Sequence, residues 1–256
     1  MGVAVIGALV LAGAGLVLLV LVGATAHRPD ASVADRDEYF ALYAPLHGGY
    51  DPRTGAALVR WWLGGIHRLA APLARAGTSA DVLTLLGVWA AGAVVVCADA
   101  HGHWPLLGIV AVKVSGVLDN IDGAVAVMTR RATALGYVID SVLDRVGDGL
   151  LLVALWRLGA PAWSCVTAGC AVLLLEYTRA RAGNAGLSDI GVVTVGERPT
   201  RFIVTAIGLL AAGIWTRRAD DAGAVAALAT AGVCLVAWLQ LSAVVVRRLR
   251  AAPPPG

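Results

Sequence analysis

Long apolar segments recur along the whole chain and constrain its fold more than any other feature. The first of them, Met1–Ala26, contains no charged side chain. A helix of that length can cross a hydrocarbon core about 30 Å thick, and a helix satisfies its own backbone hydrogen bonds in lipid. Hydrophobic residues make up 59% of the sequence and charged residues only 14%, a balance unlike that of soluble domains. The sequence therefore predicts an all-α, polytopic transmembrane helix bundle.

Six further apolar segments bring the predicted number of spans to seven. They are Val82–Cys97, Trp104–Leu118, Leu135–Leu158, Trp163–Leu175, Phe202–Trp215 and Ala222–Val246. The small residues Ala24, Thr25 and Ala26 could mark a signal-peptidase site. The apolar run before them is long and has no basic leader, so an uncleaved anchor is favoured.

The placement of arginine predicts the orientation in the membrane. Arginines precede the second span and occur at Arg130 and Arg131, within Arg179–Arg201 and within Arg247–Arg250. Because cytoplasmic segments carry an excess of basic residues, we expect the amino terminus outside and the carboxyl terminus inside. Arg217 and Arg218 fall on the opposite side and are an unexplained exception. The formal charge of +3 gives no indication of a nucleic-acid partner.

A polar and amphipathic stretch, residues 27–78, separates the first span from the others. Arg60 and Arg68 lie on either side of Trp61 and Trp62 there, a mixture typical of a helix lying at headgroup depth. An ordinary soluble linker helix is the alternative. We therefore expect an anchor at residues 1–26, an interfacial segment at 27–78, a membrane domain at 79–250 and a disordered tail at 251–256.

Four aspartates interrupt two neighbouring apolar segments. Asp119 and Asp122 share one face of the first predicted helix, and Asp140 and Asp144 share one face of the next. Helices joined by a short connection pack antiparallel, so both pairs should lie near the turn that joins them, at its cytoplasmic end. Four carboxylates in a low dielectric repel one another unless cations lie among them. Oxygen ligands without nearby cysteine or histidine indicate Mg²⁺ or Mn²⁺.

The stretch DNIDGAVAVMTRRATALGYVIDSVLD, from Asp119 to Asp144, resembles the signature of the CDP-alcohol phosphotransferase family. The matching positions are Asp119, Asp122, Gly123, Ala126, Gly136, Asp140 and Asp144. The resemblance implies six family helices, to which this chain adds an amino-terminal span, and two divalent ions held by the four aspartates. It further implies that Asp144 is the general base, that a CDP-activated lipid is the donor, and that the protein is a homodimer in the membrane.

The resemblance also implies which residues bind the donor nucleotide: Asp119, Asp122, Gly123, Ala126, Thr133 and Gly136, with Arg130 and Arg131. Gly123 and Gly136 would let it approach the helix backbone closely, although small residues also mediate helix packing in membranes. Thr133 lies where the family places a hydroxyl against the donor, or is only a turn residue. The arginine that usually follows Ala126 is Val127 here. Arg130 or Arg131 could supply the missing charge if the helix continues that far.

The segments EYTRARA and ERPTR resemble those near the acceptor pocket of the phosphatidylinositol-phosphate synthase branch. They supply the four predicted acceptor-binding residues, Arg179, Arg181, Arg198 and Arg201. Guanidinium groups could hold an acceptor phosphate, as in inositol phosphate or glycerol phosphate. Basic residues flanking cytoplasmic helix ends are the simpler explanation for some of them.

The resemblance predicts transfer of a phosphatidyl or related group from a CDP-lipid to a small hydroxyl acceptor, with release of CMP. A non-catalytic relative or a cation-handling membrane carrier is the alternative, although no internal repeat typical of transporters is evident. Four cysteines lie inside apolar runs without the short paired spacing of zinc sites, and a disulfide between them stays possible.

Overall fold

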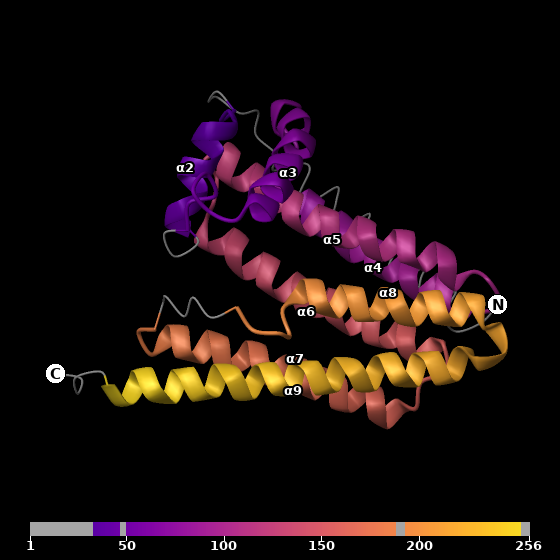
Figure 1. The fold of residues 1–256 in the computed structure, drawn as a ribbon. Helices are drawn as coiled ribbons and strands as arrows, with labels where there is room; N and C mark the ends of the chain where they lie inside the picture. Colours follow the sequence, from indigo (N-terminus) through magenta and orange to yellow (C-terminus); the bar gives the residue numbers. More distant parts are fainter. Residues whose placement is uncertain (1–32, 47–49, 188–192, 252–256) are drawn as a thin grey trace. The chain divides into compact units, whose positions relative to one another are not determined.

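The computed structural model describes residues 33–46, 50–187 and 193–251. The predicted amino-terminal span lies outside these residues, and so does almost all of the predicted tail. Every regular element in the described part of the chain is helical, which confirms the all-α class (Figure 1). The four cysteines are free thiols.

Eight α-helices and one short 3-10 helix, η1, make up the described fold. In chain order they are α2 (Arg36–Leu46), α3 (Ala57–Arg75), α4 (Ala80–Asp99), α5 (Pro105–Met128), α6 (Ala134–Arg157), α7 (Ala162–Asn184), α8 (Arg198–Ile214), η1 (Thr216–Arg218) and α9 (Ala219–Ala251).

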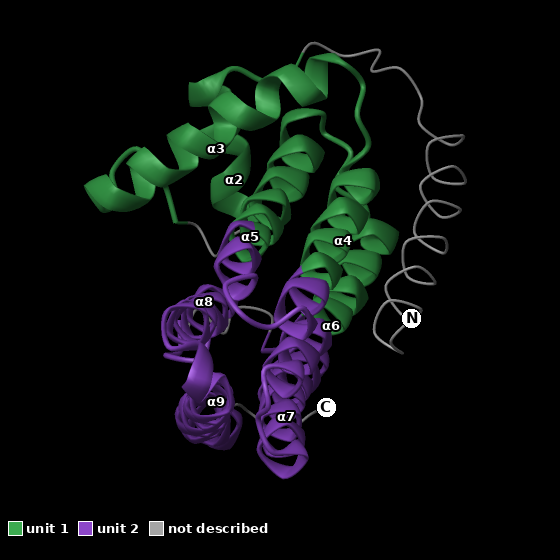
Figure 2. Cartoon of the chain, turned by 90° about the vertical axis from the view of Figure 1, so that its right-hand side faces the viewer, with its two compact units in different colours: residues 1–93, 111–147 green, residues 94–110, 148–256 purple. Residues whose placement is uncertain are grey.

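The chain divides into two compact units, which Figure 2 shows in different colours. Unit 1 comprises residues 1–93 and 111–147, and unit 2 comprises residues 94–110 and 148–256. Three long helices, α4, α5 and α6, contribute residues to both units. The predicted metal-binding aspartates belong to unit 1, whereas the predicted acceptor-binding arginines belong to unit 2.

The core of unit 1 joins α2 and α3 to the end of α5. Tyr39 and Phe40 from α2 are buried with Ile66 from α3 and with Met128 from α5. The side chain of Asp35 caps α2, because its Oδ1 accepts the Glu38 backbone N–H at 2.9 Å. This packing fixes the segment that precedes the turn between the two aspartate-bearing helices.

Helix α3 carries apolar side chains on its exposed side as well as on its buried side. Leu63 and Ile66 are buried in the core of unit 1, yet Leu58 and Trp61 are 74% and 71% exposed. A soluble helix rarely leaves large apolar side chains of this kind together in water. The helix therefore has an apolar surface in addition to the one that it packs against the protein.

Unit 2 is built mainly from α7, α8 and α9, which lie side by side (Figure 1). Leu175 of α7 packs against Ala237 and Leu241 of α9. Helix α8 approaches α9 closely at Gly208, where an added Cβ would lie 2.6 Å from the Cβ of Ala226. Small residues thus set the separation of these helices, as they do in membrane proteins generally.

Within the described residues, two helical stretches are long and apolar enough to cross a bilayer. They are Ala80–Asp99 and Thr216–Ala251, which match the second and the last of the predicted spans. The other predicted spans do not stand out by length and composition, because α8 has 17 residues and because acidic residues interrupt α5 and α6. Their number stays a prediction.

Candidate metal and nucleotide site

Three signature aspartates converge in unit 1. Asp119 comes from α5, and Asp140 and Asp144 come from α6, one helical turn apart. One carboxylate oxygen from each lies within 4.8 Å of the others. The two helices face each other here because the short turn after Met128 folds α6 back along α5. Carboxylates from both helices therefore meet, as the spacing in the sequence indicates.

Asp122 lies beside this cluster but does not belong to it. Its side chain is nearly fully buried, at 3% exposure, and its Oδ1 accepts the Gly123 backbone N–H at 2.5 Å. Within the described part of the chain, the Oδ2 of Asp122 and the Oδ1 of Asp140 are buried without a hydrogen-bond partner. Buried carboxylate oxygens without a donor are costly, because nothing replaces their lost hydration.

These acids fit a divalent cation. The cluster offers oxygen ligands only, which suits Mg²⁺ or Mn²⁺ better than a metal that prefers sulfur or imidazole. The two buried oxygens without a donor are the atoms that a cation would satisfy. Asp144 Oδ2 also lies 3.4 Å from the Arg145 guanidinium.

A pocket of about 730 Å³ opens next to the aspartates and is lined by most of the signature residues. Those predicted from the sequence to contact the donor and found on its wall are Asp122, Gly123, Ala126, Arg131, Thr133 and Gly136. Asp140 lines it too. The pocket therefore brings one metal-ligand candidate of each helix together with the small residues of the signature.

The structure distinguishes the two signature glycines. A Cβ added to Gly123 would meet no atom within 4 Å, so helix packing does not explain why this residue is small. A Cβ added to Gly136 would lie 3.2 Å from Thr133 Oγ1. Gly123 is thus the position at which a missing side chain leaves room in the pocket.

Thr133 caps the amino terminus of α6. Its Oγ1 accepts the Gly136 backbone N–H at 3.0 Å, the bond expected of a residue immediately before the helix. The residue also lines the pocket. Its structural role is therefore clear, and its hydroxyl remains close enough to the pocket for the predicted contact with the donor.

Helix α5 ends before it reaches the two arginines that follow it. Arg130 has a left-handed backbone with φ of 53°, and the N–H of Arg131 bonds to the carbonyl of Ala126 at 2.9 Å, which together form a Schellman-type ending. Arg130 pairs with Glu38, whereas Arg131 lines the pocket. Val127 is 9% exposed and belongs to the core of unit 1.

Asp81 is a pocket residue that was not predicted from the sequence. It lies in the first turn of α4 and lines the pocket together with Thr84. Its Oδ1 lies 4.0 Å from the Cβ position of Gly136. The available signal was an acidic residue at the first turn of an apolar helix, a position for which helix capping is the usual explanation.

The predicted acceptor-binding arginines lie in unit 2, and three of them bind carboxylates. Arg201 Nη1 lies 2.7 Å from Asp148 Oδ2, and its Nη2 lies 2.9 Å from Glu176 Oε1. Arg198 Nε lies 3.8 Å from the other oxygen of Asp148, and Arg179 Nη2 lies 2.7 Å from Glu197 Oε1. The network joins α6, α7 and α8.

Arg181 is separate from this network and exposed. The carboxylates of the network were not among the predicted site residues. Asp148 follows Asp144 at the spacing of one helical turn, and Glu176 precedes Arg179 at i, i+3 spacing, so both carried a sequence signal.

The carboxylate of Glu197, immediately before α8, accepts several hydrogen bonds. Burial raises the pKa of its carboxyl, but hydrogen bonds from the Thr194 backbone N–H, from Arg179 and from the Thr194 hydroxyl outweigh it, so the net pKa lies below the ordinary value. Thr194 donates at 2.9 Å from its N–H and at 2.8 Å from its hydroxyl. The carboxylate therefore ties the loop before α8 to α7.

Residues 77–246 match the family model of CDP-alcohol phosphatidyltransferase. The archaetidylinositol phosphate synthase of Methanothermobacter thermautotrophicus is 34% identical over 151 residues, which cover 57% of this chain and 74% of that protein. The phosphatidylinositol phosphate synthase of Mycobacteroides abscessus is 32% identical over 155 residues, covering 57% of this chain and 68% of that protein.

The fold is also that of a solved structure. Crystal structures of Mycobacterium tuberculosis phosphatidylinositol phosphate synthase superpose with a TM-score of 0.58 at 24% identity. The one in complex with manganese and citrate covers 71% of this chain and 88% of its own, and the one with CDP-DAG bound covers 70% and 92%.

The helical fold and its acidic cluster define a membrane enzyme of the metal-dependent phosphotransfer type. The chain belongs to the CDP-alcohol phosphatidyltransferase family. It is accordingly a transferase of phospholipid biosynthesis.

Proposed function

We propose that the protein transfers a phosphatidyl group from a CDP-activated lipid such as CDP-diacylglycerol to a small phosphorylated alcohol and releases CMP. Inositol phosphate is the first candidate acceptor, because the similar proteins are archaetidylinositol phosphate and phosphatidylinositol phosphate synthases, and glycerol phosphate is the second. The observation that carries the proposal is the convergence of Asp119, Asp140 and Asp144 beside the signature-lined pocket.

Two Mg²⁺ or Mn²⁺ ions are proposed to be held by Asp119, Asp122, Asp140 and Asp144. The buried oxygens of Asp122 and Asp140 that lack a donor support the inclusion of both residues. The ions, when bound, would neutralise the donor pyrophosphate and stabilise the charge that develops on the leaving CMP. The side chains of the protein would bind the substrates and accept the proton of the attacking hydroxyl.

Asp144 is proposed to be the general base. The acceptor hydroxyl oxygen attacks the phosphorus that bears the lipid, a new P–O bond forms, and the P–O bond to CMP breaks. The hydroxyl proton passes to the Asp144 carboxylate, and CMP leaves with the bonding electron pair. The Arg145 guanidinium lies 3.4 Å from the Asp144 carboxylate and attracts it.

The pocket next to the cluster is proposed to hold the CDP moiety. Gly123 and Ala126 leave room for the nucleotide against α5, and Arg131 on the pocket wall replaces the arginine that the family usually carries at position 127. Arg130 is a weaker candidate for the donor phosphate, because it pairs with Glu38. Gly136 and Thr133 would contact the donor from the start of α6.

Arg179, Arg181, Arg198 and Arg201 are proposed to serve the acceptor phosphate. The network in unit 2 supports distinct roles for them. Arg201 binds Asp148 and Glu176 through its two terminal nitrogens, so it holds the group in place, whereas Arg198 lies 3.8 Å from Asp148 and over the Phe202 ring. The guanidinium of Arg198, at the start of α8, is the proposed direct contact for the acceptor phosphate.

We propose an integral-membrane protein with its active site facing the cytoplasm, its amino terminus outside and its carboxyl terminus inside. Residues 79–250 would form the catalytic membrane domain, which agrees closely with the matched residues 77–246. Trp61 and Leu58 on the exposed side of α3 support an interfacial role for residues 27–78. The resemblance to the family also supports a homodimer.

Release of CMP from radiolabelled CDP-diacylglycerol tests this function. Purified protein is assayed with and without Mg²⁺ against inositol phosphate, glycerol phosphate and unphosphorylated inositol. We expect metal-dependent CMP release with a phosphorylated acceptor and none after chelation. The family assignment argues against the cation-carrier alternative. Absence of turnover with every acceptor would favour the non-catalytic relative instead.

A further inference from the structure

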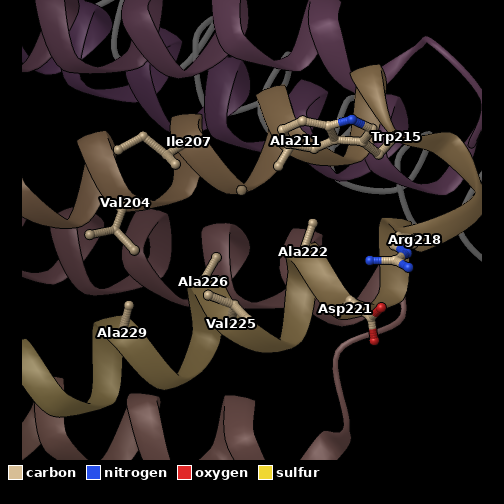
Figure 3. A pocket seen from close by; sticks show the side chains of 11 residues that line it. Val204, Ile207, Ala211, Trp215, Arg218, Asp221, Ala222, Val225, Ala226 and Ala229 are labelled. Carbon is tan, nitrogen blue, oxygen red and sulfur yellow. The ribbon is translucent and has the colours of Figure 1, made fainter.

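An apolar groove in unit 2 has no part in the proposed reaction. It runs along α8 and the start of α9, encloses about 700 Å³, and is lined mainly by apolar side chains. Figure 3 shows Val204 and Ile207 on one wall and Ala222 and Val225 on the other. The groove is hollow because the residues between the walls, including Gly208 and Ala211, are small.

Two opposite charges stand at one end of this groove. Arg218 and Asp221 both line it, at the end where Trp215 also lies (Figure 3). Both charged side chains are exposed. Arg218 and its neighbour Arg217 are the residues that the distribution of charge left unexplained, because they fall on the side of the membrane that basic residues usually avoid.

The groove has the length of one leaflet. From Val204 to Trp215 the rise of α8 is about 16 Å, and from Asp221 to Ala229 the rise of α9 is about 12 Å. Half of a hydrocarbon core of about 30 Å is about 15 Å. A groove that begins at a tryptophan and a charge pair and extends about 15 Å along a membrane helix matches a single acyl chain below its headgroup.

The two neighbouring acids at the start of α9 have different surroundings. Asp220 packs against Gly159, whose φ is 114° and whose added Cβ would lie 2.7 Å from the Cβ of Asp220. Asp220 therefore forms part of the contact between α9 and the loop after α6. Asp221 makes no such close contact with a glycine and lines the groove instead.

We propose that this groove binds one membrane phospholipid whose headgroup carries both a phosphate and a primary ammonium, as phosphatidylethanolamine does. The guanidinium of Arg218 binds the phosphate and the carboxylate of Asp221 binds the ammonium, both by charge-assisted hydrogen bonds. One acyl chain fills the groove between α8 and α9. The site is distinct from the donor pocket, which lies in unit 1 and is lined by other residues.

Native mass spectrometry of the delipidated, full-length protein tests the proposal without using its activity. Phosphatidylethanolamine, phosphatidylglycerol and phosphatidylcholine with identical acyl chains are titrated separately. All three lipids carry the phosphate, so only the hydrogen bond from the primary ammonium to Asp221 distinguishes them. Retention of phosphatidylethanolamine should therefore exceed that of the other two by a factor on the order of tenfold, as one charge-assisted hydrogen bond in a partly exposed site allows.

Three variants assign the binding to the groove. Arg218→Ala should weaken retention of all three lipids, whereas the neighbouring Arg217→Ala should not, because Arg217 does not line the groove. Asp221→Asn should remove only the preference for phosphatidylethanolamine. Ala229→Trp should block one bound lipid, and Leu228→Trp, on an exposed position outside the groove, should not.

Equal retention of the three lipids, unchanged by Arg218→Ala, would overturn the proposal and leave the groove as a surface for bulk lipid. A change from dimer to monomer in Ala229→Trp without loss of lipid would also overturn it, since the occupant would then be a second copy of the chain.

Discussion

Arg201 and Asp148 form a buried ion pair, with 2.7 Å between Nη1 and Oδ2 and with exposed side-chain fractions of 5% and 4%. Glu176 completes the group by accepting from Nη2 of the same guanidinium. Two carboxylates from α6 and α7 thus hold one arginine of α8. This arrangement gives Arg201 a structural role at the start of α8.

Removal of Arg201 should destabilise the fold. Arg201→Ala removes the nearest cation of the buried Asp148 and of the half-buried Glu176 and leaves each with a more distant arginine at 3.8 Å, and breaking a buried pair costs about 3–5 kcal/mol in free energy of unfolding. Arg181→Ala, an exposed control on α7, should change the stability by less than about 0.5 kcal/mol. Thermal unfolding in detergent measures both. Equal melting temperatures would show that the network contributes little.

Arg198 should act on the acceptor rather than on the fold. If its guanidinium binds ground-state phosphate, Arg198→Ala raises the KM for the acceptor and leaves the KM for the CDP-lipid unchanged. Arg198→Lys should recover part of the loss, because it retains the charge without the planar fork of donors. Steady-state kinetics with each substrate varied in turn distinguishes the cases. An effect on the donor KM alone would contradict this role.

Loss of the proposed base should stop the transfer without emptying the metal site. Asp144→Asn removes the proton acceptor but leaves Asp119, Asp122 and Asp140, so Mn²⁺ binding should weaken and persist while CMP release falls to background. The assay pairs turnover with Mn²⁺ titration on the same preparation. Wild-type turnover in the variant would rule out Asp144 as the base.

Gly123 should matter for the donor and not for packing. A Cβ at this position meets no neighbour within 4 Å but enters the pocket wall, so Gly123→Val should raise the KM for the CDP-lipid without lowering the melting temperature. Gly92→Val is the matched control, because Gly92 also has no neighbour within 4 Å and does not line the pocket. A similar rise in both variants would point to a general effect on the helices.

Much of the aspartate cluster could be predicted from sequence because its spacing is local. Three- and four-residue intervals place Asp119 and Asp122, and Asp140 and Asp144, on single helix faces, and the short turn between the helices brings these faces toward each other. The structure brings Asp119, Asp140 and Asp144 into one cluster. The helical type of these segments and their approximate bounds could also be predicted, because an apolar run is likewise a local feature of the sequence.

The rest depended on contacts between distant segments. The end of α5 is set by a left-handed Arg130, which no propensity favours, so the sequence did not show that the helix stops before the two arginines. The carboxylates that hold Arg201 lie 53 and 25 residues away in the chain. Asp81 reaches the pocket only through the packing of α4, and a capping role explained it equally well.

Direct titration with Mn²⁺, followed by electron paramagnetic resonance, tests whether the aspartate cluster holds divalent metal. The wild-type protein should bind Mn²⁺, and Asp140→Asn should weaken that binding at least about tenfold. Asp37→Asn, which alters an exposed acid of α2, should bind as the wild type does. Equal Mn²⁺ affinity in all three proteins would contradict the account, because the converging carboxylates would then not be the site of the metal.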